Sequence, residues 1–289
     1  MLPVSSAMKI ASPVALVLCG GSSRGALEVG LYRAVRELGL PIDLVIGSSI
    51  GALNGACIAA GMSPLALAEL WRGMRRRDVI HWNWRGLLRP YRYPGLYTLD
   101  PLRELLRRAL PKTRFEQLPL PLTIVTTELQ GARPVYWSGA GDIIESILAS
   151  MSLPVAFPPV EIAGRQFVDG GFANNVPLDR AVELGAREAL LISCVCCPPK
   201  LKPYRGVVDV LARSLTIAMD RKYAADFAYF ADKVRIHAVQ PQFERDIGLL
   251  DFRYSAELAE EGYRASLAYF RNAKIGASVG ACVSGRRGS

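Results

Sequence analysis

Short apolar runs alternate with longer amphipathic segments along this 289-residue chain, and this alternation limits its fold more than any other feature. Strands are predicted for Val14–Cys19, Leu44–Ile46, Leu122–Thr126, Val135–Trp137, Ala189–Cys194 and Val234–Val239. Helices are predicted for Gly25–Leu38, Ile50–Ala60, Pro64–Arg75, Pro101–Leu110, Ile143–Ala149, Pro177–Leu184, Val207–Tyr229 and Ser255–Phe270. Because strands that alternate with helices usually pair in parallel, we expect an α/β fold with a mostly parallel sheet and helices on both faces.

The composition is that of a globular protein, with 51% hydrophobic and 21% charged residues. No apolar run approaches the ~20 residues of a membrane span. The run Val14–Leu18 is too short for the core of an export signal, and we interpret it as the first core strand. We expect one domain over residues 10–275, a flexible Gly-, Ser- and Ala-rich tail over 276–289, and a cytoplasmic location.

The segment Gly47-Ser48-Ser49-Ile50-Gly51 lies between a predicted strand and a predicted helix. In a G-x-S-x-G sequence the two glycines remove the Cβ atoms that would clash in a sharp turn. Such a turn exposes the serine hydroxyl at the top of the sheet and aims the next backbone N–H at the same point. Ser49 is therefore a candidate nucleophile and Ile50 a candidate oxyanion donor, and an ordinary tight turn is the alternative.

A glycine-rich loop, Cys19-Gly20-Gly21-Ser22-Ser23-Arg24-Gly25, follows the first strand and opens the first helix. A loop of this kind turns backbone N–H groups toward one point, where a phosphate or an oxyanion would fit. The loop is not a Walker nucleotide-binding loop, which needs Lys and then Ser or Thr after its last glycine, because Ala-Leu follows here. It does not match the dinucleotide-binding fingerprint either, because Ser22 occupies a position that must be glycine. Beside a nucleophile elbow, Gly20 to Ser23 are candidate oxyanion donors, and without the elbow the loop would be a structural turn.

The histidine content restricts the base that could activate Ser49. The chain has two histidines, His81 and His237. His81 lies in a region without a strand signal, and His237 lies inside a predicted strand, where a packed, hydrogen-bonded histidine is the expected outcome. A carboxylate base is therefore favoured over a Ser-His-Asp triad.

Asp169 is the best candidate for that carboxylate. The preceding residues 160–168 predict a hairpin that turns at Ala163-Gly164. Gly170 and Gly171 follow Asp169 and allow its carboxylate to lie in a crowded, sharply turned position. An ordinary Asp-Gly turn is the alternative interpretation.

The cysteines do not predict a metal centre. The chain has six: Cys19, Cys57, Cys194, Cys196, Cys197 and Cys282. Cys194 to Cys197 form a C-x-C-C string, but a zinc site needs four ligands, and the sequence has no second paired cluster. We interpret these cysteines as buried free thiols, which is typical of a reducing compartment.

Residues 71–97 are rich in aromatic and basic side chains. The aromatic residues are Trp71, Trp82, Trp84, Tyr91, Tyr93 and Tyr97, and the basic ones are Arg72, Arg75, Arg76, Arg77, Arg85, Arg89 and Arg92. Tryptophan and tyrosine suit the headgroup layer of a bilayer, and arginine attracts anionic lipid. Because the whole chain also carries a net charge of +9, we predict that this region makes peripheral contact with an anionic membrane. A solvated basic loop with its aromatic residues in the core is the alternative, and no nucleic-acid-binding motif is present.

Four motifs in order resemble the patatin-like phospholipase family, over about Val14 to Pro177. They are the loop Gly20–Gly25, the elbow Gly47–Gly51, the stretch Ala149–Pro154 followed by Phe157–Val160, and Asp169-Gly170-Gly171 with Asn175 and Pro177. The chain departs from the family pattern at Ser22, which replaces the third glycine of the loop, and at Ser152, where alanine is common. The Cβ of Ser22 would narrow the site while its backbone N–H remains.

The resemblance implies a three-layer α/β/α fold and a lipid acyl hydrolase that acts on phospholipid or related lipid esters. Ser49 would be the nucleophile of a Ser-Asp dyad, and Asp169 its base. Gly20, Gly21, Ser22, Ser23 and Ile50 would form the oxyanion hole, supported by Arg24, Gly25, Gly47, Gly51, Gly170 and Gly171. Arg24 would anchor the loop or face a phosphate headgroup. No cofactor or metal is implied.

Three other functions remain open at this point. A thioesterase or acyltransferase could use the same dyad and would differ only in the acyl acceptor. An α/β-hydrolase would need a histidine after the acid, and His237 alone has that place in the sequence. A lipid-binding module that kept the fold without the activity is the third alternative, although both Ser49 and Asp169 are present.

Overall fold

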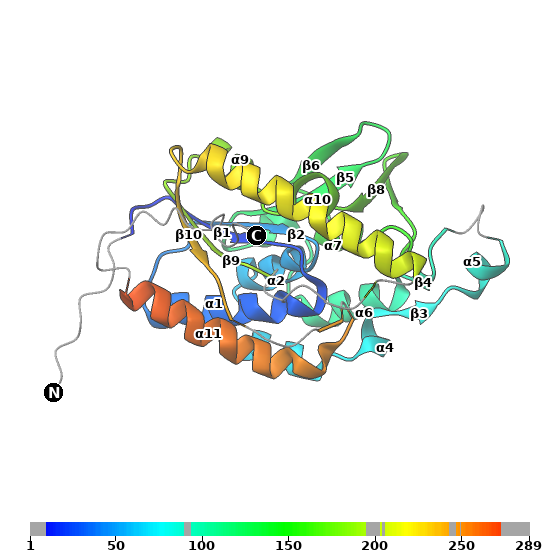
Figure 1. The fold of residues 1–289 in the computed structure, drawn as a ribbon, viewed down its shortest axis with the longest axis horizontal. Coiled ribbons are helices and arrows are strands. Elements are labelled where there is room, and N and C mark those ends of the chain that lie inside the picture. The colour runs from blue at the N-terminus through cyan, green and yellow to red at the C-terminus, as the bar shows by residue number, and fades with distance from the viewer. Residues whose placement is uncertain are drawn as a thin grey trace.

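The computed structural model describes residues 10–89, 94–194, 203, 206–242, 247–248 and 250–272 (Figure 1). The predicted tail over 276–289 lies outside the described residues, as do Tyr91, Arg92 and Tyr93 of the aromatic region. Cys196, Cys197 and Cys282 also fall outside them.

One eight-stranded sheet forms the centre of the described fold, in the order β10-β9-β1-β2-β5-β8-β7, with β6 paired to β5. The parallel strands are β1 (Val14–Leu18), β2 (Leu44–Ser48), β5 (Leu122–Glu128), β9 (Glu188–Ile192) and β10 (Arg235–Val239). The antiparallel strands are β6 (Arg133–Trp137), β7 (Val160–Ile162) and β8 (Arg165–Asp169). The predicted α/β class with a mostly parallel sheet is confirmed.

Helices cover both faces of this sheet (Figure 1). On one face lie α1 (Ala26–Glu37), α2 (Ile50–Ala59), α3 (Pro64–Gly73), α6 (Asp100–Ala109), α7 (Ile143–Ser150) and α11 (Ser255–Asn272). On the other lie α8 (Gly171–Asn174), α9 (Leu178–Glu183) and α10 (Val207–Phe230). Strand β1 joins the two layers, because Leu16 packs into the first core and Val17 into the second. The expected α/β/α arrangement is present.

The aromatic and basic region contains short elements that the sequence did not predict. Strands β3 (His81–Trp82) and β4 (Tyr97–Thr98) pair antiparallel, flanked by α4 (Arg76–Val79) and α5 (Trp84–Leu88). The expectation that His81 lies outside any strand was therefore wrong. A two-residue strand is too short to show the alternation by which strands are recognised. None of the described helices combines the length and apolarity that a bilayer crossing requires.

Candidate active site

Ser49 occupies a strained turn between β2 and α2. It has φ 54° and ψ −125°, a left-handed backbone conformation that side chains with a Cβ rarely adopt. The turn depends on its glycines, since a Cβ on Gly47 would collide with the backbone of Gly51, and a Cβ on Gly51 with the carbonyl of Leu18. The predicted strand–turn–helix context of Ser49 is therefore present, and its hydroxyl stands at the end of β2, half-buried.

The end of α7 holds this turn in place. The backbone N–H of Ser49 donates to Ser150 Oγ at 2.8 Å, and the Ser150 hydroxyl donates to the carbonyl of Val125 at 2.6 Å. Ser150 thus links the turn to β5. Because the N–H of Ser49 is bonded to Ser150, the hydroxyl is the polar group that Ser49 presents to the site.

Asp169, the last residue of β8, lies beside Ser49 although 120 positions separate them in sequence. The Ser49 hydroxyl donates to Asp169 Oδ2 at 2.6 Å. The other carboxylate oxygen, Oδ1, accepts the N–H of Gly171 at 2.8 Å. The backbone of Asp169 is fixed as well, because its carbonyl accepts the Thr127 hydroxyl at 2.8 Å and its N–H donates to Ser152 at 3.0 Å.

The environment of Asp169 makes its carboxylate a stronger base than an exposed aspartate. Its side chain is buried, and burial raises its pKa from 3.8 to about 6, against the opposing hydrogen bonds from Ser49 and Gly171. The carboxylate is ionised at neutral pH and can accept a proton from the hydroxyl that contacts it.

The glycine-rich loop approaches the Ser49 side chain closely. A Cβ placed on Gly20 would lie 3.0 Å from the Cβ of Ser49. The N–H of Gly20 itself donates to Asn175 Oδ1 at 2.9 Å. Gly20 therefore brings the loop to the serine, while its N–H is already engaged by Asn175.

The later residues of the loop form the 3-10 turn Ser22–Gly25, which leads directly into α1. Ser22 has φ 54°, so a side chain occupies a left-handed position that favours glycine. Ile50 is the first residue of α2, where backbone N–H groups have no carbonyl partner within the helix. The loop also meets this helix start, since a Cβ on Gly25 would come within 2.7 Å of the Ile50 side chain.

Arg24 contacts carbonyl groups on two other segments. Its guanidinium donates to the carbonyl of Cys194 at 3.5 Å and to that of Ile247 at 3.4 Å. The Ser23 hydroxyl adds a bond to the Gly248 carbonyl at 2.9 Å. These contacts fit an anchoring role for Arg24 in the loop.

A family model described as patatin-like phospholipase matches residues 16–182, which include the loop, the elbow and Asp169. The chain belongs to this family.

Relatives of this patatin-like phospholipase share part of its length. An uncharacterized NTE family protein of Mycobacterium tuberculosis is 30% identical over 197 residues, covering 66% of the chain and 53% of that protein. Patatin-like phospholipase domain-containing protein 7 of Rattus norvegicus is 32% identical over 185 residues, covering 62% of the chain and 13% of that protein. Lysophospholipase nte1 of Aspergillus terreus is 31% identical over 173 residues, covering 60% of the chain and 11% of that protein. The chain thus spans about half the length of the mycobacterial relative.

The fold is also found in a solved structure. The match to the crystal structure of VipD from Legionella pneumophila covers 89% of this chain and 66% of the VipD chain. The TM-score is 0.50 and the sequence identity is 15%. At this identity the likeness concerns the architecture alone.

Neither histidine of this patatin-like phospholipase takes the place of Asp169 beside the serine. His237 is buried on β10, which β9 and β1 separate from β2, and its Nε2 lies 2.6 Å from Glu188 Oε2. Burial lowers the pKa of His237, against the contrary effect of Glu188. His81 is exposed on β3. The expected packed, hydrogen-bonded state of His237 is confirmed.

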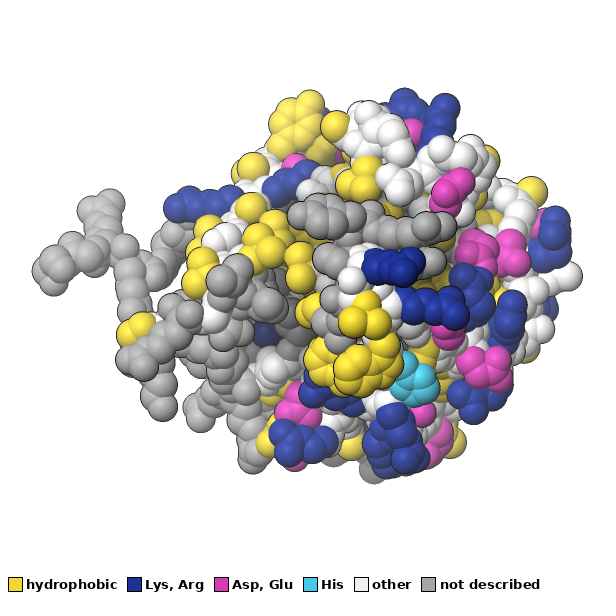
Figure 2. All heavy atoms as spheres, turned by 90° about the vertical axis from the view of Figure 1, so that its right-hand side faces the viewer, with side chains coloured by type: hydrophobic (Ala, Val, Ile, Leu, Met, Phe, Trp, Pro, Cys, Tyr) yellow, Lys and Arg dark blue, Asp and Glu magenta, His cyan; other side chains and the backbone are white. Residues whose placement is uncertain are grey.

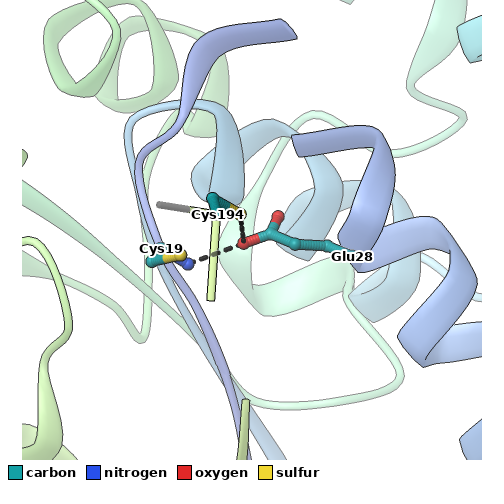
Figure 3. A group of neighbouring side chains, drawn as sticks. All are labelled: Cys19, Glu28 and Cys194. Carbon is teal, nitrogen blue, oxygen red and sulfur yellow. Dashed lines mark hydrogen bonds between the residues drawn. The ribbon is translucent and has the colours of Figure 1, made fainter. Parts of the chain in front are cut away.

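Cys19, the first residue of the glycine-rich loop, belongs to a buried group of side chains with Glu28 and Cys194 (Figure 3). Cys19, Glu28 and Cys194 bring their ligand atoms within 4.8 Å of one another, as a metal site would require. Each is hydrogen-bonded already: Glu28 Oε1 accepts the N–H of Cys19 at 2.7 Å and the thiol of Cys194 at 3.8 Å. Within the described part of the chain this group offers three such ligands, whereas structural zinc sites use four.

Glu28 connects the segment after the glycine-rich loop to the helix after Ser49. Its Oε2 accepts Asn54 Nδ2 from α2 at 2.8 Å, and Asn54 Oδ1 accepts the indole N–H of Trp71 at 2.8 Å. Burial raises the pKa of Glu28 well above its usual range. Trp71, predicted as part of a membrane-facing region, is buried at 1% exposure, so that placement was wrong.

The sequence interpretation assigned no role to Ser150, Asn175, Glu28 or Asn54. Glu28 and Asn54 carried a readable signal, because each is a polar residue inside an otherwise apolar helix face and is fully buried. Ser150 and Asn175 lie within the family-like motifs, but their partners are distant in sequence and become visible in the fold alone.

Proposed function

We propose that this patatin-like phospholipase is a serine acyl hydrolase that cleaves carboxylic esters of phospholipids or related lipids. The observation that carries the proposal is the 2.6 Å hydrogen bond from Ser49 Oγ to Asp169 Oδ2, at the tip of a strained strand-to-helix turn. A hydroxyl that donates to a buried carboxylate has the geometry of a nucleophile and its base. The lysophospholipase name of one relative supports a lipid ester as the substrate.

The first half of the reaction forms an acyl-enzyme. Ser49 Oγ attacks the ester carbonyl carbon while its proton passes to Asp169 Oδ2. The carbonyl oxygen becomes an oxyanion, and N–H groups of Gly21, Ser22, Ser23 and Ile50 are our candidate donors to it. One such donor typically contributes ~3–4 kcal/mol to transition-state stability. The C–O bond then breaks, and the departing alcohol takes the proton from Asp169.

The second half releases the acyl group. Asp169 accepts a proton from water, and the resulting hydroxide attacks the acyl carbon of the Ser49 ester. When the tetrahedral intermediate collapses, the fatty acid leaves and Ser49 Oγ regains the proton from Asp169. Because Asp169 returns to its starting state, no external proton carrier is needed for a turnover.

Membrane contact through the aromatic and basic region is part of this proposal. Trp82 and Trp84 are 53% and 69% exposed, and the neighbouring Arg75 to Arg77 are exposed as well. Figure 2 shows hydrophobic side chains gathered on this face among Lys and Arg side chains. Exposed indole rings beside arginines suit the headgroup layer of an anionic bilayer.

The test compares wild type, Ser49→Ala and Asp169→Asn on a short p-nitrophenyl ester and on mixed phospholipid vesicles. We expect both variants to lose turnover of both substrates while remaining folded, as a cooperative thermal transition would show. Near-full activity of Asp169→Asn would falsify the dyad. Adding a primary alcohol or thiol to the same assay would show whether water is the preferred acyl acceptor.

A further inference from the structure

Helix α10 has an outer face that differs from that of an ordinary surface helix. Val210, Leu211, Ile217 and Tyr229 are 47%, 41%, 48% and 64% exposed. The other exposed side chains described on α10 are Arg221, Lys222, one serine and four alanines. All of these positions follow one another at three- and four-residue spacings, so they form one continuous face. No acidic side chain is among the exposed ones described on this helix.

Helix α11 shows what a water-facing helix of this protein looks like. Its outer face carries Glu257, Glu260, Arg264 and Arg271, and Glu260 pairs with Arg33 of α1 at 3.1 Å. Surface helices usually turn such charged residues outward and apolar ones inward. The outer face of α10 therefore has the composition of a covered surface, although the described part of the chain leaves these side chains exposed.

The inner face of α10 lies against the candidate active site. The Met219 side chain occupies the space beside Gly171, where a Cβ on that glycine would come within 2.8 Å of Met219 Cε. Burial raises the pKa of Asp220 on the same helix, against the opposing charges of Arg213 and Arg24. One helix thus contacts the Asp169 segment on one side and exposes apolar side chains on the other.

We propose that the outer face of α10 docks on an anionic lipid surface, with Leu211 and Ile217 entering the headgroup layer. This inference rests on the proposed function, because it assigns the surface through which a lipid ester would reach Ser49. Apolar residues combined with Lys and Arg on one helix face are typical of interfacial helices. Lys222 forms an ion pair with Asp226, so the attraction rests on Arg221 and on the net charge of +9.

Charge favours a lipid surface over a second copy of the chain. A symmetric dimer through this face would bring Arg221 of both copies into one interface, where like charges repel. An anionic bilayer supplies the opposite charge.

The test uses Ser49→Ala protein, so that vesicles are not hydrolysed, and measures sedimentation with vesicles of phosphatidylcholine with and without phosphatidylglycerol. We expect Leu211→Ser/Ile217→Ser to bind the anionic vesicles about tenfold more weakly than the parent. The matched control Leu65→Ser/Leu184→Ser removes two exposed leucines from other helices and should bind as the parent does. Arg221→Glu should weaken binding most at low salt.

Activity assays separate this inference from the function itself. With Ser49 restored, the α10 double variant should hydrolyse the short p-nitrophenyl ester normally but attack vesicles more slowly. If the Ser49 or Asp169 variants kept their activity, the proposed function would be wrong. The vesicle-binding measurement would still test whether the outer face of α10 docks on lipid. Unchanged vesicle binding by the folded α10 variant would overturn the inference. Light scattering gives a second way to overturn the inference. If the wild-type protein were a dimer and the α10 double variant a monomer, a second copy of the chain would occupy this face.

Discussion

Asn54 Nδ2 lies 2.8 Å from Glu28 Oε2, and this contact ties the helix after the glycine-rich loop to the helix after the nucleophile turn. Asn54 also donates to the carbonyl of Gly25 at 3.0 Å and accepts the indole N–H of Trp71. All of these polar groups are buried. The relative position of the candidate oxyanion donors and Ser49 is therefore set by an amide in the core.

Asn54→Ala should be strongly destabilising, because it leaves buried partners on three residues without a hydrogen bond. We expect a loss of roughly 2–4 kcal/mol in the free energy of unfolding, measured by urea denaturation. Trp71→Phe is the milder control, since it removes the one N–H and keeps an aromatic ring, although a smaller one; a loss of about 1–2 kcal/mol is expected from the lost hydrogen bond. If both variants unfolded at the same urea concentration as wild type, the hydrogen bonds of Asn54 would contribute nothing measurable to stability.

The pKa of Asp169 predicts how activity depends on pH. The base must be ionised to accept the Ser49 proton, so kcat/KM for a short ester should rise with pH through about 6 and then level off. An activity profile that was flat from pH 4 to pH 8 would contradict this assignment of the base.

The same shift predicts the effect of Asp169 on stability. Its pKa is higher in the folded state, about 6, than its usual value of 3.8, so ionisation opposes folding. The stability from this group is full below pH 4 and is lost as pH rises to 6, a change of roughly 3 kcal/mol. Asp169→Asn lacks this titration, so its stability relative to wild type should increase between pH 4 and pH 7 in chemical denaturation. A constant difference would argue against the raised pKa.

Ser22 should be replaceable by glycine at a lower cost in stability than by alanine. Its φ of 54° costs a residue with a Cβ roughly 1 kcal/mol, which glycine avoids. Ser22→Ala is the matched control, because it removes the same hydroxyl and keeps the Cβ. We expect Ser22→Gly to unfold at a higher urea concentration than Ser22→Ala, and the reverse order would show that the backbone is relaxed at this residue.

His237 should be needed for stability and not for turnover. Its ring is the partner of the buried Glu188 carboxylate, so His237→Ala should lower the free energy of unfolding by roughly 2–4 kcal/mol. At temperatures where the variant is folded, kcat on the short ester should stay within about twofold of wild type, whereas loss of a triad histidine costs several orders of magnitude. A fall of that size would restore the triad alternative.

The sequence predicted elements whose signals are local. The period of the helices, the apolar strands and the hairpin turn at Ala163-Gly164 are all present, and both turn residues have positive φ. The strand–turn–helix structure around Ser49 could be predicted for the same reason, because its glycines and the flanking apolar runs are adjacent in the chain.

Contacts between distant segments could not be read in this way. The engagement of the Gly20 N–H by Asn175 joins residues 155 positions apart, and no pattern near either residue indicates it. The burial of Trp71 was missed because composition grouped it with Trp82 and Trp84, which are exposed. Side-chain burial depends on the face of a helix that packs, and α3 turns Trp71 inward toward Asn54.

Strand β8 is held in a fixed alignment, with its Phe167 opposite Val160 of β7 and its Asp169 opposite Thr126 of β5. Successive side chains of a strand point to opposite faces, so sliding β8 by one residue would turn the Asp169 carboxylate away from Ser49 and present Val168 instead. The hairpin turn fixes how far β8 can slide. Lengthening that turn by one residue is therefore expected to abolish the proposed activity without replacing any residue of the candidate active site.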